Sequence, residues 1–251
     1  MSFENKVIIV TGASSGIGAA TAILFAKEGA NVVMVGRNET KLKNVSDSCA
    51  QVGKRPLVII ADVSKDEDAK RIVKETIDKF GKLDVLVNNA GWSKSGTILD
   101  GSILKSYDDT FSVNVRAVVH LTALAAPHLV KSKGNIVNVS SIAALTTPKA
   151  SNMIAYFVSK AALDHFTRGA ANELAPSGVR VNSVNPGPVV TDFMKNQGLD
   201  TKFEDFTYLT ALDRVSQPDE IANMIEYLAG EKAVGITGSI FVVDNGMLLK
   251  M

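Results

Sequence analysis

The residues best suited to acid–base chemistry in this chain are Tyr156 and Lys160, which lie four positions apart. The stretch Ala155–Leu163 has helical periodicity, and residues at this spacing share one face of a helix. Carbonyl reduction requires a proton donor at the oxygen, but a free phenol has a pKa of about 10. A neighbouring ammonium favours the phenolate. We therefore expect Lys160 to lower the pKa of Tyr156, and Tyr156 to act as general acid and base.

Two serines are candidates for binding a substrate oxygen. Ser140 and Ser141 follow Asn135–Val139, an apolar run typical of a buried strand. Ligands bind at the carboxyl ends of parallel strands, where a hydroxyl can hydrogen-bond a substrate. We expect one of the two serines to have this role.

A glycine-rich stretch, Thr11–Gly18, directly follows the apolar run Val7–Val10 and opens a helical pattern. Small residues between a strand and a helix let backbone N–H groups approach a pyrophosphate, and the helix N-terminus adds a favourable dipole. An ordinary tight turn is the alternative, but the strand before it and the helix after it favour a phosphate site. The residues expected to bind the phosphates are Gly12, Ser14, Ser15, Gly16, Ile17 and Gly18.

The end of the second expected strand indicates which cofactor binds. An NAD-preferring fold usually has an acidic residue there for the ribose hydroxyls. Here the strand ends in Val35-Gly36-Arg37-Asn38, and Arg37 offers a planar, permanently charged group suited to a phosphate. We expect Arg37 and Asn38 to bind the cofactor, with Lys41 as a further phosphate ligand, and the cofactor to be NADP(H). The alternative is that Arg37 is an ordinary solvated residue.

A proline-containing turn follows the expected strand Val179–Val184. Its prolines restrict the backbone, which we expect to reach the nicotinamide amide. Thr191 is expected to contact the amide or the pyrophosphate, although an ordinary turn or helix cap is an equal alternative. The residues expected to bind the cofactor here are Pro186, Gly187, Val189 and Thr191.

These residues require strands and helices that alternate along the chain. Apolar β-branched runs predict strands at Val7–Val10, Asn31–Val35, Leu57–Ile60, Val85–Val87, Asn135–Val139, Val179–Val184 and Ser239–Val242. Helical periodicity predicts helices at Gly18–Glu28, Glu39–Gln51, Asp66–Phe80, Ile103–His128, Ala155–Leu174 and Pro218–Ala229. Parallel crossovers need helices, so we expect an α/β fold, one doubly wound domain over residues 1–251 with a parallel sheet of about seven strands and helices on both faces.

Composition argues against several classes of protein. With 27 Lys and Arg against 26 Asp and Glu, the net charge is +1, which gives no electrostatic case for nucleic acid or a membrane surface. The single Cys49 and the absence of zinc-type spacing favour a reducing compartment and no metal site. No signal-peptide core or uninterrupted apolar run of about 18 residues is present, so we expect a cytoplasmic protein.

The motifs occur together in an order that resembles the short-chain dehydrogenase/reductase family. They are Gly12–Gly18, Asp62-Val63, Asn88-Asn89-Ala90-Gly91, Asn114, Ser140-Ser141, Tyr156-x-x-x-Lys160 and Pro186-Gly187. The resemblance covers essentially the whole chain and implies a Rossmann-type fold and a carbonyl-reductase-like activity. It also implies a homo-oligomer, either a tetramer or a dimer.

The resemblance also implies roles for individual residues. Asp62 and Val63 flank the adenine, and Asn89, Ala90 and Gly91 line the cofactor cleft. Taken alone, Asp62 is better explained as a helix cap, and Asn88–Gly91 as a turn.

At the reacting centre, the resemblance makes Lys160 a ligand of the nicotinamide ribose and selects Ser141 over Ser140. Ser141 lies fifteen positions before Tyr156, slightly farther than is usual in the family, which indicates extra residues within Ala143–Met153. Asn114 matches the residue that holds a water beside the lysine in the family, although a mid-helix Asn can also face solvent.

The substrate side is expected to be apolar. Residues 192–214 suggest a mobile lid, with a small helix pair covering the core as the alternative. The residues expected to contact substrate are Ser141, Trp92, Met153 and Phe193. This favours a lipophilic carbonyl, such as a steroid, terpenoid or quinone.

Two other functions compete with carbonyl reduction. A non-catalytic NADP(H)-binding sensor or scaffold is disfavoured by the complete Ser141, Tyr156 and Lys160 set. An epimerase or dehydratase on the same fold usually needs a larger substrate region than a chain of 251 residues provides.

Overall fold

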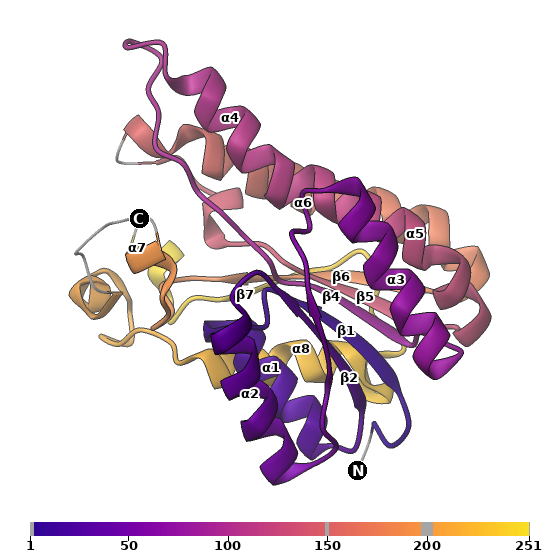
Figure 1. Ribbon diagram of the computed structural model, residues 1–251. Coiled ribbons are helices and arrows are strands. Elements are labelled where there is room, and N and C mark those ends of the chain that lie inside the picture. The colour runs from indigo at the N-terminus through magenta and orange to yellow at the C-terminus, as the bar shows by residue number, and fades with distance from the viewer. Residues whose placement is uncertain (1–2, 149–150, 197–202, 251) are drawn as a thin grey trace.

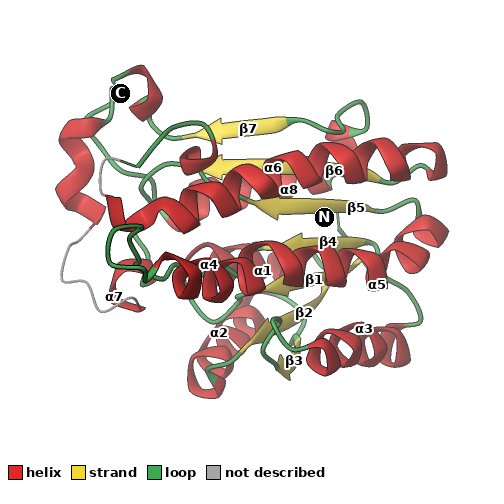
Figure 2. Cartoon of the chain, turned by 90° about the horizontal axis from the view of Figure 1, so that it is seen from above, coloured by secondary structure: helices red, strands yellow, loops and turns green. Residues whose placement is uncertain are grey.

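A seven-stranded parallel sheet forms the centre of the molecule, in the order β3-β2-β1-β4-β5-β6-β7 (Figures 1 and 2). The computed structural model describes residues 3–148, 151–196 and 203–250. The strands are β1 (Val7–Thr11), β2 (Asn31–Gly36), β3 (Leu57–Ile60), β4 (Val85–Asn88), β5 (Asn135–Val139), β6 (Arg180–Pro186) and β7 (Ile240–Val243). The predicted doubly wound α/β fold is therefore confirmed.

Helices cover both faces of this sheet, as each parallel crossover requires. The α-helices are α1 (Gly16–Lys27), α2 (Glu39–Val52), α3 (Asp66–Phe80), α4 (Ile103–Phe111), α5 (Ala117–Ser132), α6 (Ile154–Leu174), α7 (Phe193–Asn196) and α8 (Pro218–Ala229). One core is formed by α1, α2 and α8 against the sheet, and the other by α3, α5 and α6 (Figure 1). Because both faces are buried, β1 and β4 are continuous apolar runs up to their last residues, Thr11 and Asn88, rather than alternating.

The expected helix Ile103–His128 differs in detail from the structure. A π-helical turn, η1 (Ser112–Arg116), separates α4 from α5 and contains Asn114. Such turns commonly occur at functional sites. The continuous run Ile103–Ser132 is long and apolar enough to cross a membrane by length and composition alone. In this fold its α5 part packs in the core, which explains its apolar character.

The order of the strands places the site. The chain winds outward from β1 to β3 on one side of the sheet and from β4 to β7 on the other. The loops after β1 and β4, which are neighbours in the sheet, therefore diverge at their carboxyl ends. This switch point is where open α/β sheets bind ligands.

Candidate active site

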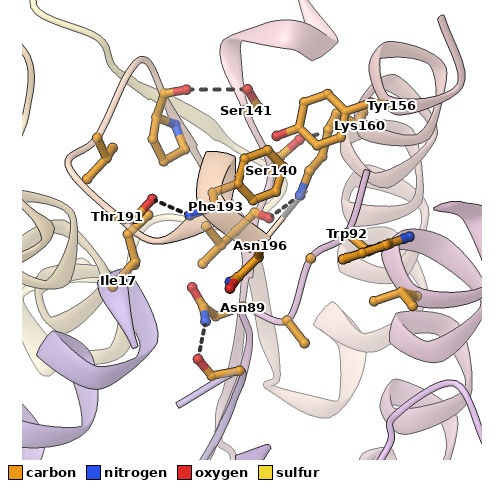
Figure 3. Close-up of a pocket in the computed structure, with 18 of the residues that line it drawn as sticks. Ile17, Asn89, Trp92, Ser140, Ser141, Tyr156, Lys160, Thr191, Phe193 and Asn196 are labelled. Carbon is orange, nitrogen blue, oxygen red and sulfur yellow. Dashed lines mark hydrogen bonds between the residues drawn. The ribbon is translucent and has the colours of Figure 1, made fainter. Parts of the chain in front are cut away.

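A cavity of about 430 Å³ opens at this switch point and continues along the carboxyl ends of the neighbouring strands (Figure 3). It is lined by these residues expected to bind cofactor or substrate: Gly12, Ser14, Ser15, Gly16, Ile17, Arg37, Asp62, Val63, Asn89, Ala90, Gly91, Trp92, Ser141, Met153, Tyr156, Lys160, Pro186, Gly187, Val189, Thr191 and Phe193. Gly18, Asn38 and Asn114 do not line it. The fold therefore brings together residues from the whole length of the chain.

The glycine-rich turn forms a cradle at one end of the cavity. Gly12 has φ of +65°, a left-handed conformation that side chains rarely adopt. Gly18 packs against the Gly12 carbonyl oxygen, where a Cβ would overlap that atom. The turn before α1 is thus held tightly against the end of β1. Gly18 shapes the cradle without lining it, whereas we expected it to bind the phosphates.

The Asn88–Gly91 segment holds this turn in place. The Thr11 hydroxyl accepts hydrogen bonds from the backbone N–H groups of Asn89 and Ala90, both at 3.0 Å. The Asn89 amide donates in return to the Thr11 carbonyl oxygen at 2.8 Å. The ends of β1 and β4 are therefore linked before any ligand binds, which pre-organises the cradle.

At the adenosine end, Arg37 and Asp62 face one another. Arg37 Nη1 lies 4.0 Å from Asp62 Oδ2, and the Arg37 side chain is 67% exposed, so its charge is available at the rim of the cavity. Asp62 accepts from the Ser64 backbone and hydroxyl, which gives it a turn-capping contact as well as a place in the cavity lining.

Asn38 and Lys41, which we expected to bind the cofactor together with Arg37, make other contacts in the structure. Asn38 caps α2 by accepting from the Lys41 backbone N–H at 2.9 Å, which explains why it does not line the cavity. The Lys41 ammonium is bound to Asp192, from the segment after β6, at 2.5 Å. Lys41 thus spans the mouth of the cleft rather than pointing unpaired at a phosphate position.

The catalytic candidates meet at the other end of the cavity. Tyr156 and Lys160 extend from successive turns of α6, and Ser141 faces them from the loop after β5 (Figure 3). Lys160 Nζ lies 5.7 Å from the centre of the Tyr156 ring and donates to the Val139 carbonyl at 2.9 Å. The three side chains therefore form one cluster beside the cofactor cradle.

The structure distinguishes the two serines by their contacts. The Ser140 hydroxyl is buried and donates to the Lys160 carbonyl at 3.2 Å, so it ties β5 to α6. The Ser141 hydroxyl is directed to the cavity side and interacts with the Tyr156 hydroxyl. This geometry favours Ser141 as the substrate-facing residue.

The expected lowering of the Tyr156 pKa does not occur. Burial raises the pKa of Tyr156 to about 12, and a hydrogen bond with Ser141 only partly offsets this. Burial also lowers the pKa of Lys160 to about 8, while Asp164 opposes that change. Desolvation of the phenolate is the largest cause, because a buried charge loses its hydration. Tyr156 is thus held as a neutral phenol at neutral pH.

Asn114 is buried beside this cluster and does not face solvent. Its amide exchanges two hydrogen bonds with the Trp92 backbone, each 2.8 Å, and donates a third to the Ser159 hydroxyl at 3.0 Å. A Cβ built on Gly91 would lie 3.7 Å from Lys160 Nζ and 3.8 Å from Asn114 Oδ1. Asn114 and Lys160 therefore lie on the same side of Gly91.

The substrate side of the cavity is largely apolar. The Phe193 ring lies 5.6 Å from the Tyr156 ring, directly over the catalytic cluster (Figure 3). Within the expected lid, α7 and a 3-10 segment (Phe203–Leu209) contribute Phe193, Met194, Asn196 and Phe206 to the lining. Residues 197–202 of the expected lid, and residues 149–150 of the expected insertion, lie outside the described residues. Lid mobility stays a prediction.

Several lining residues were not anticipated from the sequence. They include Ile142, Phe157 and Met247. Met247 comes from the C-terminal segment after β7, and no local motif marks it. Phe157 follows Tyr156 on α6, but consecutive helical residues do not share a face, so the position of Tyr156 did not indicate it.

Comparisons with known proteins agree with this site. Residues 12–248 match the family model described as Enoyl-(Acyl carrier protein) reductase. The chain is 37% identical to the A-factor type gamma-butyrolactone 1'-reductase (1S-forming) of Streptomyces virginiae, over 98% of this chain and 96% of that enzyme.

Solved structures show the same fold along the whole chain. A short-chain dehydrogenase/reductase of unknown function from Caenorhabditis elegans, crystallised with cofactor, is 38% identical with a TM-score of 0.93, covering 100% of this chain and 98% of that one. The L-sorbose reductase of Gluconobacter frateurii, complexed with NADPH and L-sorbose, is 32% identical with a TM-score of 0.89, covering 100% and 99%. The chain therefore belongs to the short-chain dehydrogenase/reductase family of nicotinamide-dependent oxidoreductases.

Proposed function

We propose that this protein is an NADP(H)-dependent reductase that converts a ketone to a secondary alcohol by reversible hydride transfer. The observation that carries the proposal is the cluster of Ser141, Tyr156 and Lys160 at one end of a cavity whose other end is the glycine cradle. When bound, the nicotinamide supplies or accepts the hydride. The residues of the chain then have two tasks, which are to transfer a proton and to orient the substrate.

Tyr156 is suited to reduction because it is protonated at neutral pH, with a pKa of about 12. It donates its proton to the carbonyl oxygen as negative charge develops there, and Ser141 holds the same oxygen by a hydrogen bond. Lys160 binds the cofactor ribose and stabilises the phenolate that Tyr156 becomes. Asn114 supports the return of a proton to that phenolate.

The preference for NADP(H) is supported by Arg37. Its guanidinium is exposed at the adenosine end of the cavity, and the same strand end carries no carboxylate that would repel a 2′-phosphate. Asp62 is the nearest acidic group, and it is already engaged by Ser64 and Arg37. The L-sorbose reductase relative was solved with NADPH, which is consistent with the same preference here.

The apolar lining supports a lipophilic, uncharged carbonyl as substrate, of the steroid, terpenoid or quinone class. Trp92, Met153, Phe193 and Phe206 line the substrate side, and these side chains offer no charge to a substrate carboxylate or phosphate. The relatives' names cover a sugar and a butyrolactone, so family membership leaves the substrate open. We also propose a single domain, a homo-oligomer and a cytoplasmic location.

The test is loss of nicotinamide absorbance with NADPH and, separately, NADH, against steroid, quinone, aliphatic and aromatic carbonyls. Tyr156→Phe should retain NADPH binding and lose turnover by about 10²- to 10⁴-fold. Tyr227→Phe on α8, whose ring is partly exposed and does not line the cavity, is the matched control and should keep wild-type turnover. Tight NADPH binding without turnover on any carbonyl or alcohol would instead favour the sensor function.

An α,β-unsaturated ketone separates carbonyl reduction from the double-bond reduction that the family model's description mentions. Because Tyr156 and Ser141 are placed to bind and protonate an oxygen, we expect an allylic alcohol as the product. A saturated ketone would contradict the assigned proton transfer.

A further inference from the structure

A second polar cluster lies behind the catalytic residues and is centred on Asp164. Asp164 is on α6, one helical turn after Lys160 and two after Tyr156, so the three residues share a face of that helix. Only 4% of Asp164 is exposed. A buried carboxylate is costly unless hydrogen bonds and an opposite charge compensate it, so the partners of Asp164 indicate why it is there.

The carboxylate is held by two residues of β6. Asp164 Oδ1 accepts from the Ser183 hydroxyl at 3.0 Å, and Oδ2 accepts from the Asn185 amide at 2.7 Å. The second N–H of the Asn185 amide donates to the Ser141 carbonyl oxygen at 3.0 Å. Asn185 therefore bridges a buried carboxylate on α6 to the backbone of the residue that faces Tyr156.

The bridge has one orientation. The Asp164 carboxylate and the Ser141 carbonyl can only accept, so the end of the amide between them is its nitrogen. Asn185 Oδ1 lies 2.8 Å from the Ser183 hydroxyl, whose single proton can go to Asp164 or to Asn185. Rotating the amide would set its oxygen against the carboxylate and the Ser141 carbonyl. The backbone of Ser141 is thus tied to the same helix that carries Tyr156 and Lys160.

Asp164 also affects the pKa of the Lys160 ammonium. From the neighbouring elements, the Lys160 ammonium lies against two uncharged groups: it donates to the Val139 carbonyl at the end of β5, and a Cβ on Gly91 after β4 would lie 3.7 Å from it.

The titratable neighbours of Lys160 lie on α6 itself. Burial lowers the pKa of Lys160 to about 8, and the negative charge of Asp164 acts in the opposite direction. Tyr156 is a neutral phenol over that pH range. The carboxylate of Asp164 therefore offsets part of the effect of burial on the Lys160 ammonium.

We propose that Asp164 is a positioning residue of the active site, whose carboxylate orients Ser141 through Asn185 and supplies the counter-charge to the Lys160 ammonium. The kinetic part of the inference rests on the proposed function, whereas the charge of Lys160 is measurable without turnover.

Asp164→Asn separates charge from hydrogen bonding. The new amide can accept from Asn185 with its oxygen and donate to Ser183 with its nitrogen, which frees the single Ser183 proton for Asn185. The contacts persist, with the Ser183 bond reversed in direction, and the negative charge is lost. Removing an opposite charge one helical turn away lowers the pKa of Lys160, by about one unit at the effective dielectric of a protein interior.

The pKa is measured by competitive labelling of the folded protein with trace acetic anhydride across pH, with the reaction of Lys160 quantified by peptide mass spectrometry. Asp84→Asn is the matched control, because Asp84 is 6% exposed but pairs with Lys6 and Lys82 just before β4, at the opposite end of the strands from the cavity. We expect the Lys160 titration to move in Asp164→Asn and to stay unchanged in Asp84→Asn. An unchanged titration in Asp164→Asn overturns the counter-charge role.

Asn185→Ala removes the bridge and keeps the charge. We expect kcat for the best carbonyl to fall about tenfold with NADPH affinity unchanged, because Ser141 loses its backbone anchor. Asn182→Ala is the control, since Asn182 is equally buried on β6 but bonds the Ile236 carbonyl away from the cavity. Equal kcat in the two variants overturns the positioning role.

In Asp164→Asn, the alkaline fall of the reduction rate should shift with the labelled pKa. If Asp164→Asn does not fold, Asp164→Ser removes the same charge and tests the Lys160 titration, while Asn185→Ala tests the hydrogen-bonded bridge. If the wild-type protein reduces no carbonyl, the proposed function fails, while the labelling of Lys160 still tests the counter-charge.

Discussion

Replacing Gly18 by alanine is a direct test of the cofactor cradle, because the packing there leaves no room for a methyl group. A Cβ at Gly18 would lie 2.5 Å from Asn89 Nδ2 and closer still to the Gly12 carbonyl oxygen. The methyl group must push back the backbone of the turn or the Asn89 side chain. Either movement breaks the bonds that join β1 to β4.

The magnitude follows from three effects. Overpacking of this kind costs about 2 kcal/mol. The two hydrogen bonds from the Asn89 amide, to the Thr11 and Gly12 carbonyls, are worth about 1 kcal/mol each. Alanine returns about 1 kcal/mol through its helix propensity, because Gly18 lies in the first turn of α1. The expected net destabilisation is about 3 kcal/mol, which lowers Tm by roughly 6 to 12 °C for a chain of this size.

Gly169→Ala is the matched control. Gly169 is also helical, on α6, but it is exposed and a Cβ there meets nothing within 4 Å. The same substitution should therefore raise Tm by roughly 2 to 4 °C through helix propensity alone.

Both variants are assayed by thermal unfolding with and without NADPH. We expect NADPH to raise Tm for the wild type and Gly169→Ala but not for Gly18→Ala, whose cradle is displaced. A Gly18→Ala protein as stable as the wild type, or equally stabilised by NADPH, would show that this reading of the cradle is mistaken.

Three further outcomes are expected. Ser141→Ala should lower kcat/KM about 10²-fold, whereas Ser140→Ala should keep turnover and lose about 1 kcal/mol of stability. Steady-state kinetics and thermal unfolding measure the two effects, and the reverse pattern would exchange the roles of the two serines. Arg37→Ala should raise KM for NADPH about tenfold and leave KM for NADH unchanged, while Arg55→Ala, similarly exposed on the far side of α2, should change neither. For reduction, kcat/KM should be level below about pH 7 and fall as pH rises through the Lys160 pKa of about 8, because the positive charge that stabilises the phenolate is lost. A value of kcat/KM that rises through this pH range would contradict the role assigned to Lys160.

Much of the fold and part of the site follow from local properties of the sequence. The β-branched runs and helical patterns predicted the seven strands and the main helices, because burial on both faces of a parallel sheet imposes those patterns locally. The phosphate turn and the Tyr156–Lys160 pair were also visible, since each depends on spacing within one turn or one helix.

Residues whose roles depend on distant partners were harder to assign. From the sequence we expected Asn38 to bind the cofactor beside Arg37, but its side chain caps the N-terminus of α2. Lys41 reads as a free cation, but Asp192, far along the chain, binds it.

The sequence by itself determined the family, the order of the elements and the residues that carry acid–base chemistry. Only the tertiary structure decided that Ser141 rather than Ser140 faces Tyr156, that burial raises the Tyr156 pKa, and that Asp164 and Asn185 stand behind the site. Spacing within one helix or turn is set by bond geometry. Burial and hydrogen bonding between α6, β5 and β6 depend on how segments far apart in the sequence pack together. No local sequence pattern predicts that packing.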